Sequence, residues 1–148
     1  MVKRIMPSLL DRLLNDGATT SREVREGLRR DLENLLNTSN CIIGWGADKA
    51  SLDSSILNYG VIDITTINVS TPDQKISVAK ELQKQIAALD SRFDEIVITV
   101  QPNRSESEQA LRLRLELSVE IDNVLESILM ESLLDPLATR VSVKAVST

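Results

Sequence analysis

The sequence predicts an α+β fold, in which N-terminal helices pack on a small, largely antiparallel sheet formed by the C-terminal half. Up to Leu89 the apolar residues recur at helical spacing, whereas from Ile96 onward many of them alternate with polar residues, as in half-buried strands. The length of 148 residues favours a single domain over residues 1–148, with residues 1–20 as an N-terminal segment that is free to move.

Two longer helices have clear start signals. Thr20 and Glu23 are three residues apart, as are Thr71 and Gln74. This is the spacing of a capping box, in which side chains and backbone at a helix start bond to each other. Pro72 then takes the first helical position, where a residue without an N–H group is tolerated. A shorter apolar run over residues 8–14 predicts a further helix ahead of these two.

The apolar spacing also predicts which helix faces are buried. The first long helix is expected to end near Asn37, within a polar cluster, and the second around Leu89 or Asp90. The buried stripes are predicted to comprise Val24, Leu28, Leu32, Leu35 and Leu36 in the first, and Ile76, Ala79, Leu82, Ile86 and Leu89 in the second. Residues 41–70, between them, are expected to be irregular, with a helical turn near residues 54–57.

The strands are expected in the C-terminal half. The β-branched run over residues 96–100 predicts a short strand, and Pro102 with Asn103 marks the turn after it. Residues 111–121 alternate strictly between apolar and polar, which indicates a long strand with one polar face. Residues 125–134 fit either a helix or a strand. A last strand is predicted from Val141, Val143 and Val146.

The composition argues against several kinds of function. A net charge of -5 leaves no broad basic field for nucleic acid, and three aromatic residues are too few for base stacking. The chain has no histidine and a single cysteine, Cys41, so a Cys/His nucleophile pair and a zinc ligand set are both missing. No glycine-rich phosphate loop is present. We therefore expect no catalytic residues, no metal and no cofactor.

Location and surface charge also follow from the sequence. No run approaches the ~20 apolar residues that span a bilayer, and the N-terminus becomes charged too early for a signal peptide. A cytoplasmic protein without direct membrane insertion is therefore expected. Four arginines lie in the first long helix and alternate with acidic residues: Arg22, Arg25, Arg29 and Arg30. This alternation predicts a solvent-exposed helix face with several ion pairs.

Three stretches of the chain resemble one family. RDLENLLNT (residues 30–38) is similar to the "RDLExLLNT" helix end of the baseplate wedge subunits of type VI secretion systems, and SILNYGVID (residues 55–63) to their "SVLNYGLPD" segment. PSLLDRL (residues 7–13) resembles their start. The order and spacing are nearly those of the family, which is related to the small wedge subunit of contractile phage baseplates. The resemblance is densest over residues 7–93.

One motif departs from the family pattern. The family has a Glu-Pro-Arg motif just after its second main helix, where this chain has LDSRF (residues 89–93). The acid and the arginine are kept as Asp90 and Arg92, and the proline is absent. The resemblance implies that these two residues dock the protein to its wedge partners. The alternative is that Asp90 and Arg92 only close a helix and begin a strand.

The resemblance implies a non-enzymatic assembly subunit. Its expected partners are the other baseplate wedge subunits and the first ring of the contractile sheath, which would extend an edge of the sheet at residues 96–100 or 141–146. A phage or phage-tail-like wedge protein is a close alternative. A peptidoglycan hydrolase is a remote one, because so few aromatics make a poor sugar cleft. A further alternative is a small adaptor protein of unrelated origin. Its gene would not lie beside genes for sheath and other baseplate subunits, which separates it from the wedge proteins.

Overall fold

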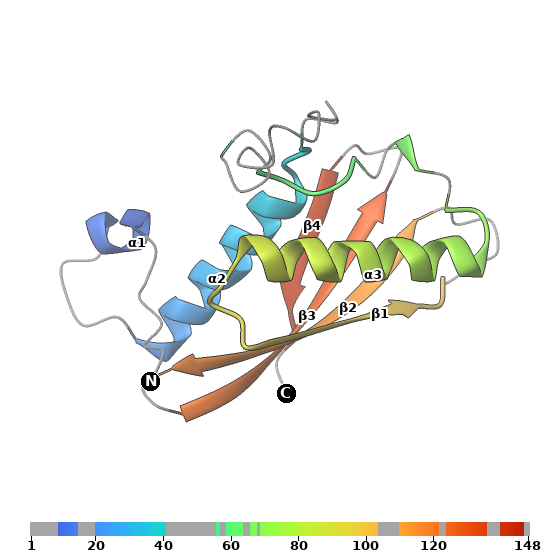
Figure 1. Ribbon diagram of the computed structural model, residues 1–148. Coiled ribbons are helices and arrows are strands. Elements are labelled where there is room, and N and C mark those ends of the chain that lie inside the picture. The colour runs from blue at the N-terminus through green and yellow to red at the C-terminus, as the bar shows by residue number, and fades with distance from the viewer. Residues whose placement is uncertain are drawn as a thin grey trace.

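The computed structural model describes residues 9–14, 20–40, 56, 59–63, 66–67, 69–103, 110–121, 124–135 and 140–146. Within these ranges three helices are followed by four strands (Figure 1). The helices are α1 (Leu9–Leu14), α2 (Ser21–Leu36) and α3 (Pro72–Leu89). The strands are β1 (Glu95–Gln101), β2 (Leu111–Ile121), β3 (Val124–Asp135) and β4 (Arg140–Ala145). The predicted α+β fold is confirmed.

Both long helices begin as predicted. The Thr20 hydroxyl accepts the Glu23 backbone N–H at 3.4 Å, and the Glu23 carboxylate accepts the Thr20 N–H at 2.9 Å. Thr71 and Gln74 form the equivalent pair at 3.3 and 3.1 Å, with Pro72 in the first turn. Each box satisfies backbone donors that have no partner within the helix, so both helix starts are fixed locally.

The predicted buried stripe of α2 is confirmed, with Val24 half-buried near the start of the helix, and α2 ends at Leu36 with Asn37 as its C-cap, close to the expected end. The stripe of α3 needs one correction. Val78, Ala79, Leu82 and Ile86 are buried, whereas Ile76 is 46% exposed. Ile76 lies seven residues before Gln83, two helical turns away on the same flank. That flank faces the outer edge of β1, where no described strand lies beneath it.

The sheet is an antiparallel meander in the order β1-β2-β3-β4. In β2 the residues alternate between buried and more exposed along the whole strand, as predicted. The segment that fitted either a helix or a strand is β3, which pairs with β2 over its full length. In Figure 1, α2 and α3 lie on the same face of the sheet, where α2 packs on β4 and α3 on β1.

Several expectations concern residues outside the described ranges. Cys41 is among them, as is most of the helical turn expected near residues 54–57. In the part of residues 41–70 that is described, Val61 lies alongside the end of α2. Its N–H donates to Thr38 O and its O accepts from Asn40 N, both at 2.9 Å, in a parallel bridge. This bridge fixes the segment that contains Gly60 against the chain after α2.

Replacing Gly60 with alanine is expected to lower the free energy of unfolding by about 2 kcal/mol or more. Gly60 has φ +126°, a conformation that L side chains rarely adopt. A Cβ atom there would also lie 2.6 Å from Thr38 O and 2.8 Å from Asn40 N. Urea unfolding of both proteins measures the difference. An unchanged midpoint would contradict the claim that this bridge is rigidly held.

Candidate partner interface

The two residues predicted to bind partners form an ion pair at the junction between α3 and β1. Asp90 follows the last residue of α3, and its N–H donates to Ile86 O at 2.9 Å. Its carboxylate accepts the Arg92 backbone N–H at 3.0 Å, which closes a tight turn. The same carboxylate meets the guanidinium side-on, with Arg92 Nε at 2.9 Å from Oδ1 and Nη2 at 2.6 Å from Oδ2. This two-point contact fixes the plane of the guanidinium.

α2 supplies a second carboxylate to this site. Arg92 Nη1 donates to Asp31 Oδ2 at 2.8 Å, across 61 positions of the sequence. The prediction from sequence missed Asp31, because no local pattern pairs it with residue 92. One signal was available, since Asp31 lies in RDLENLLNT (residues 30–38) and Arg92 in LDSRF (residues 89–93). The structure thus joins two of the stretches that were compared with the family.

The cluster of Asp31, Asp90 and Arg92 is half-buried. The three side chains are 24%, 16% and 26% exposed, respectively. The hydrogen bonds to Asp90 raise the pKa of Arg92 above its ordinary value. Partial burial opposes this rise, and the bond to Asp31 adds to it. The guanidinium therefore stays charged. A second cation is close by, since Arg30 Nη2 lies 3.9 Å from Asp31 Oδ1.

The carboxylate of Asp90 contacts the guanidinium of Arg92 directly. This contact is the one expected of a residue that orients Arg92. About a quarter of the Arg92 side chain remains accessible at the end of α3. A side chain held in place by two carboxylates binds a partner with little loss of rotamer freedom. The role of the pair in docking remains a prediction.

Three outward backbone groups of β4 are bonded to the side chains of Arg29 in α2 and of Asn37, the C-cap residue of α2. Val146 N–H donates inward to Leu129 O at 2.9 Å, so by alternation Val141 and Val143 point their backbone groups away from β3. The Asn37 amide takes both groups of Val141, accepting its N–H and donating to its O at 2.9 Å each. Arg29 Nη1 donates to Val143 O, also at 2.9 Å. The β4 edge is therefore occupied from within the molecule at both groups of Val141 and at Val143 O.

The arginine-rich face of α2 is consequently not just a solvated surface. Arg29 pairs with Glu26 and Glu33 within the helix, as expected from the alternation. However, its side chain is only 23% exposed, because it also reaches β4. Arg25 pairs with Glu126 of β3 at 2.6 Å. Sequence periodicity could not predict these contacts with the sheet, since they join residues about a hundred positions apart.

The outward groups of β1 are less occupied. Ile98 N–H donates to Gln83 Oε1 of α3 at 3.1 Å, which shows that alternate residues of β1 point their backbone groups outward. Ile96 and Val100 share this orientation. In the described part of the chain, no side chain bonds to the outward backbone groups of either residue. Both outer strands are edges, as expected, but they differ in how far they are capped.

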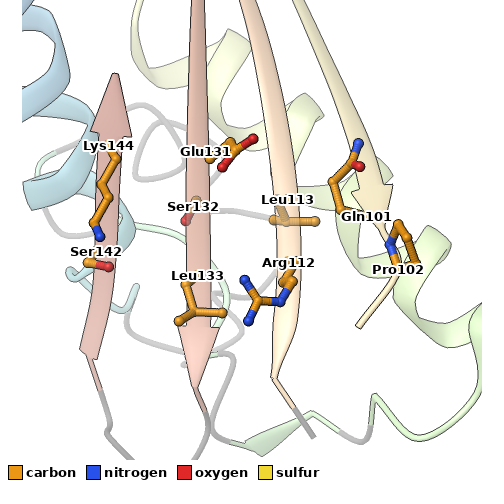
Figure 2. A pocket seen from close by; sticks show the side chains of 9 residues that line it. All are labelled: Gln101, Pro102, Arg112, Leu113, Glu131, Ser132, Leu133, Ser142 and Lys144. Atoms are coloured by element: carbon orange, nitrogen blue, oxygen red, sulfur yellow. The ribbon is translucent and has the colours of Figure 1, made fainter. Parts of the chain in front are cut away.

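A hollow of about 280 Å³ crosses one end of the sheet (Figure 2). Residues of all four strands line it, together with the residue that follows β1: Gln101, Pro102, Arg112, Leu113, Glu131, Ser132, Leu133, Ser142 and Lys144. Among these described lining residues Glu131 is the single carboxylate, whereas glycoside hydrolysis needs two. None of the described lining residues offers an aromatic surface for a sugar ring. The described part of the hollow therefore does not provide the groups of a glycosidase.

The described residues provide neither a metal site nor a helix that could span a membrane. No group of three or more His, Cys, Asp or Glu side chains is arranged there to hold a metal ion. None of the helices in the described ranges combines the length and the apolarity needed to cross a bilayer.

The comparisons with known proteins agree with the resemblance found in the sequence. The family of the baseplate wedge protein gp25 matches residues 22–124, which include α3, β1, β2 and all of α2 except its first residue. Neither the curated proteins nor the solved structures gave a match. The matched region is well over half of the chain and contains Asp31, Asp90 and Arg92. The chain therefore belongs to the family of the baseplate wedge protein gp25.

Proposed function

We propose that this chain is a non-enzymatic subunit of the baseplate of a type VI secretion system. In this role it binds other wedge subunits in the cytoplasm and helps to start polymerisation of the contractile sheath. Asp90 and Arg92 form its docking site for the wedge. An edge of its sheet accepts a strand of the first sheath ring.

Membership of the wedge family and the open-ended sheet support this proposal. The single observation that carries it is the four-stranded meander whose two outer strands are both edges. An edge exposes backbone groups that another chain can pair with, so proteins usually cover it unless it is used. Main-chain hydrogen bonds to such an edge add a partner strand in a defined register.

A hydrolase is disfavoured by the chemistry of the residues present. The chain has no histidine to serve as a general base, and its three aromatic residues give little surface for sugar stacking. Among the described residues that line the hollow at the end of the sheet, one is a carboxylate, Glu131. The cluster at the α3–β1 junction has two, but Arg92 lies between them and bonds to both.

The proposal predicts that sheath assembly from purified components depends on this chain. The protein is mixed with wedge and sheath subunits from the same gene cluster. A stable complex with the wedge is expected on gel filtration, and electron microscopy should show sheath tubes that start from it. Omission of the chain should remove most tubes. In parallel, the protein should release no fragments from labelled peptidoglycan. Turnover that disappears when one carboxylate is replaced would overturn the assignment.

A phage or phage-tail-like wedge protein would have the same fold and the same edges. The gene neighbourhood separates these two candidates. Secretion genes beside this one support the proposal, whereas tail-tube and tail-fibre genes alone support the phage-like particle. The assembly assay is then run with the subunits that the neighbourhood provides.

A further inference from the structure

We infer that β1, beneath the flank of α3, is the edge that receives the partner strand, and that side chains of α2 close β4 to such a partner. The partner is an extended segment of another chain, which adds a fifth strand next to β1. This inference rests on the proposed role in sheath initiation, and it names the edge that carries out that role. Three features of the structure support it.

The first feature is that Asn37 substitutes for a strand residue at β4. A side-chain amide has a carbonyl acceptor and an NH2 group with two donors, so it can present the same acceptor and donor as a backbone peptide group. Asn37 uses them on the N–H and the O of the same residue, Val141, at 2.9 Å each. A residue of a neighbouring antiparallel strand would make this same pair of bonds.

Further bonds hold the closing side chains on β4. The Asn37 amide also donates to Glu33 O at 2.7 Å, which orients it toward the strand. Arg29 covers Val143 O at 2.9 Å while it pairs with Glu26 and Glu33. A partner strand at β4 would have to displace three hydrogen bonds that are already made. It would also leave the released Asn37 and Arg29 groups to find other partners.

The second feature is that β1 has fewer such bonds. Among the described residues, Gln83 is the single side chain that bonds to an outward backbone group of β1, at Ile98 N–H. Ile96 and Val100 offer their outward groups on either side of it. Gln83 comes from α3 and is half-buried, so it can turn into solvent without opening the core. A partner strand at β1 would therefore displace one hydrogen bond rather than three.

The third feature is the exposed apolar surface on both sides of the β1 edge. Ile76 is 46% exposed on the flank of α3 that also carries Gln83, above the edge. Val97 is 37% exposed on the opposite face of β1. A fifth strand would lie beside both and cover part of each. The partner segment should therefore carry apolar side chains on both of its faces, toward Ile76 on one and toward Val97 on the other.

Proline substitution at the two edges tests the choice between them. The Val100 N–H points outward, so Val100→Pro removes a donor that a partner strand would use and places a ring in its path. Ala145→Pro makes the same change on β4, at a side chain that is exposed. Sheath tubes started by each variant are counted by electron microscopy, and wedge binding is followed by pull-down.

Val100→Pro is expected to reduce tube initiation at least ~10-fold while it still binds the wedge, whereas Ala145→Pro initiates like wild type. Loss of initiation in Ala145→Pro alone would overturn the choice of edge. If neither proline matters but the wild type initiates tubes, strand addition is wrong while the baseplate role survives. A wild type that neither binds the wedge nor initiates tubes would show that the proposed function itself fails, and the inference with it.

Amide hydrogen exchange gives a second readout that needs no variant. In the wild type bound to the start of a sheath, the amides of Ile96 and Val100 should exchange at least ~10-fold more slowly than in the free protein. The outward amide of Ala145 on β4 should keep its rate. Slower exchange on β4 with no change on β1 would contradict the inference, even if Val100→Pro proved too unstable to use.

Discussion

Charge reversal at Arg92 is expected to abolish binding to the wedge subunits. The Arg92→Glu variant would place a third carboxylate beside Asp31 and Asp90, in a cluster that is only about a quarter exposed. The substitution removes the cation that a partner would contact and also releases α2 from the α3–β1 junction. Because both carboxylates then lose their bonds to Arg92, the free energy of unfolding should fall by about 2 kcal/mol. Pull-down and thermal unfolding measure the two effects.

Arg92→Lys separates docking from folding. A lysine keeps the charge and can still pair with one carboxylate, but it cannot make the two parallel bonds of a guanidinium. We expect nearly normal unfolding together with binding weakened about 10-fold. Normal binding by this variant, and by Arg92→Glu under conditions where it is folded, would mean that Asp90 and Arg92 only join the helix to the strand.

Two control variants accompany these substitutions. Arg22→Glu makes the same change of charge on the exposed side of α2 and should alter neither binding nor unfolding. Asp31→Asn removes the charge of the carboxylate from α2 but leaves the two-point contact of Asp90 with Arg92 in place. It should lower the free energy of unfolding by about 1 kcal/mol and keep wedge binding. Loss of binding in Asp31→Asn would extend the docking site onto α2.

The features that could be predicted from the sequence are those in which local chemistry and tertiary structure agree. The start of α2 at Thr20 and that of α3 at Thr71 are set by side chains within one turn, so a short window contains all the information. The alternation of residues 111–121 likewise shows directly which face of β2 is buried. In each case no distant residue is needed to define the element.

The features that could not be predicted depend on distant partners. β3 is rich in leucine, which has no strong preference for strands, and its full-length pairing with β2 decides its conformation. Ile76 follows the helical period of the α3 stripe, yet the sheet ends before it can cover this residue. Asp31 joins the candidate site only because α2 passes beside the α3–β1 junction. Sequence spacing within one segment contains no trace of such contacts.

Opening the β4 edge is expected to make the protein associate with itself. The double variant Asn37→Ala with Arg29→Ala removes the three hydrogen bonds that α2 side chains make to Val141 and Val143. The edge then offers free donors and acceptors, and an identical edge on a second copy can pair with it about a two-fold axis. Light scattering after gel filtration, over a range of concentrations, should show a mass higher than that of the wild type.

A third substitution distinguishes edge pairing from general aggregation. Addition of Ala145→Pro to the double variant should restore the mass of the wild type, because the proline blocks pairing along β4 without restoring any bond to α2. Arg25→Ala, which removes an arginine of α2 that contacts β3 instead of the β4 edge, should leave the mass unchanged.

If the double variant keeps the mass of the wild type at every concentration, Asn37 and Arg29 do not protect this edge. If it associates regardless of the proline, a different surface is responsible. Restoration by the proline would show that α2 keeps β4 from pairing, which leaves β1 as the edge available to a partner.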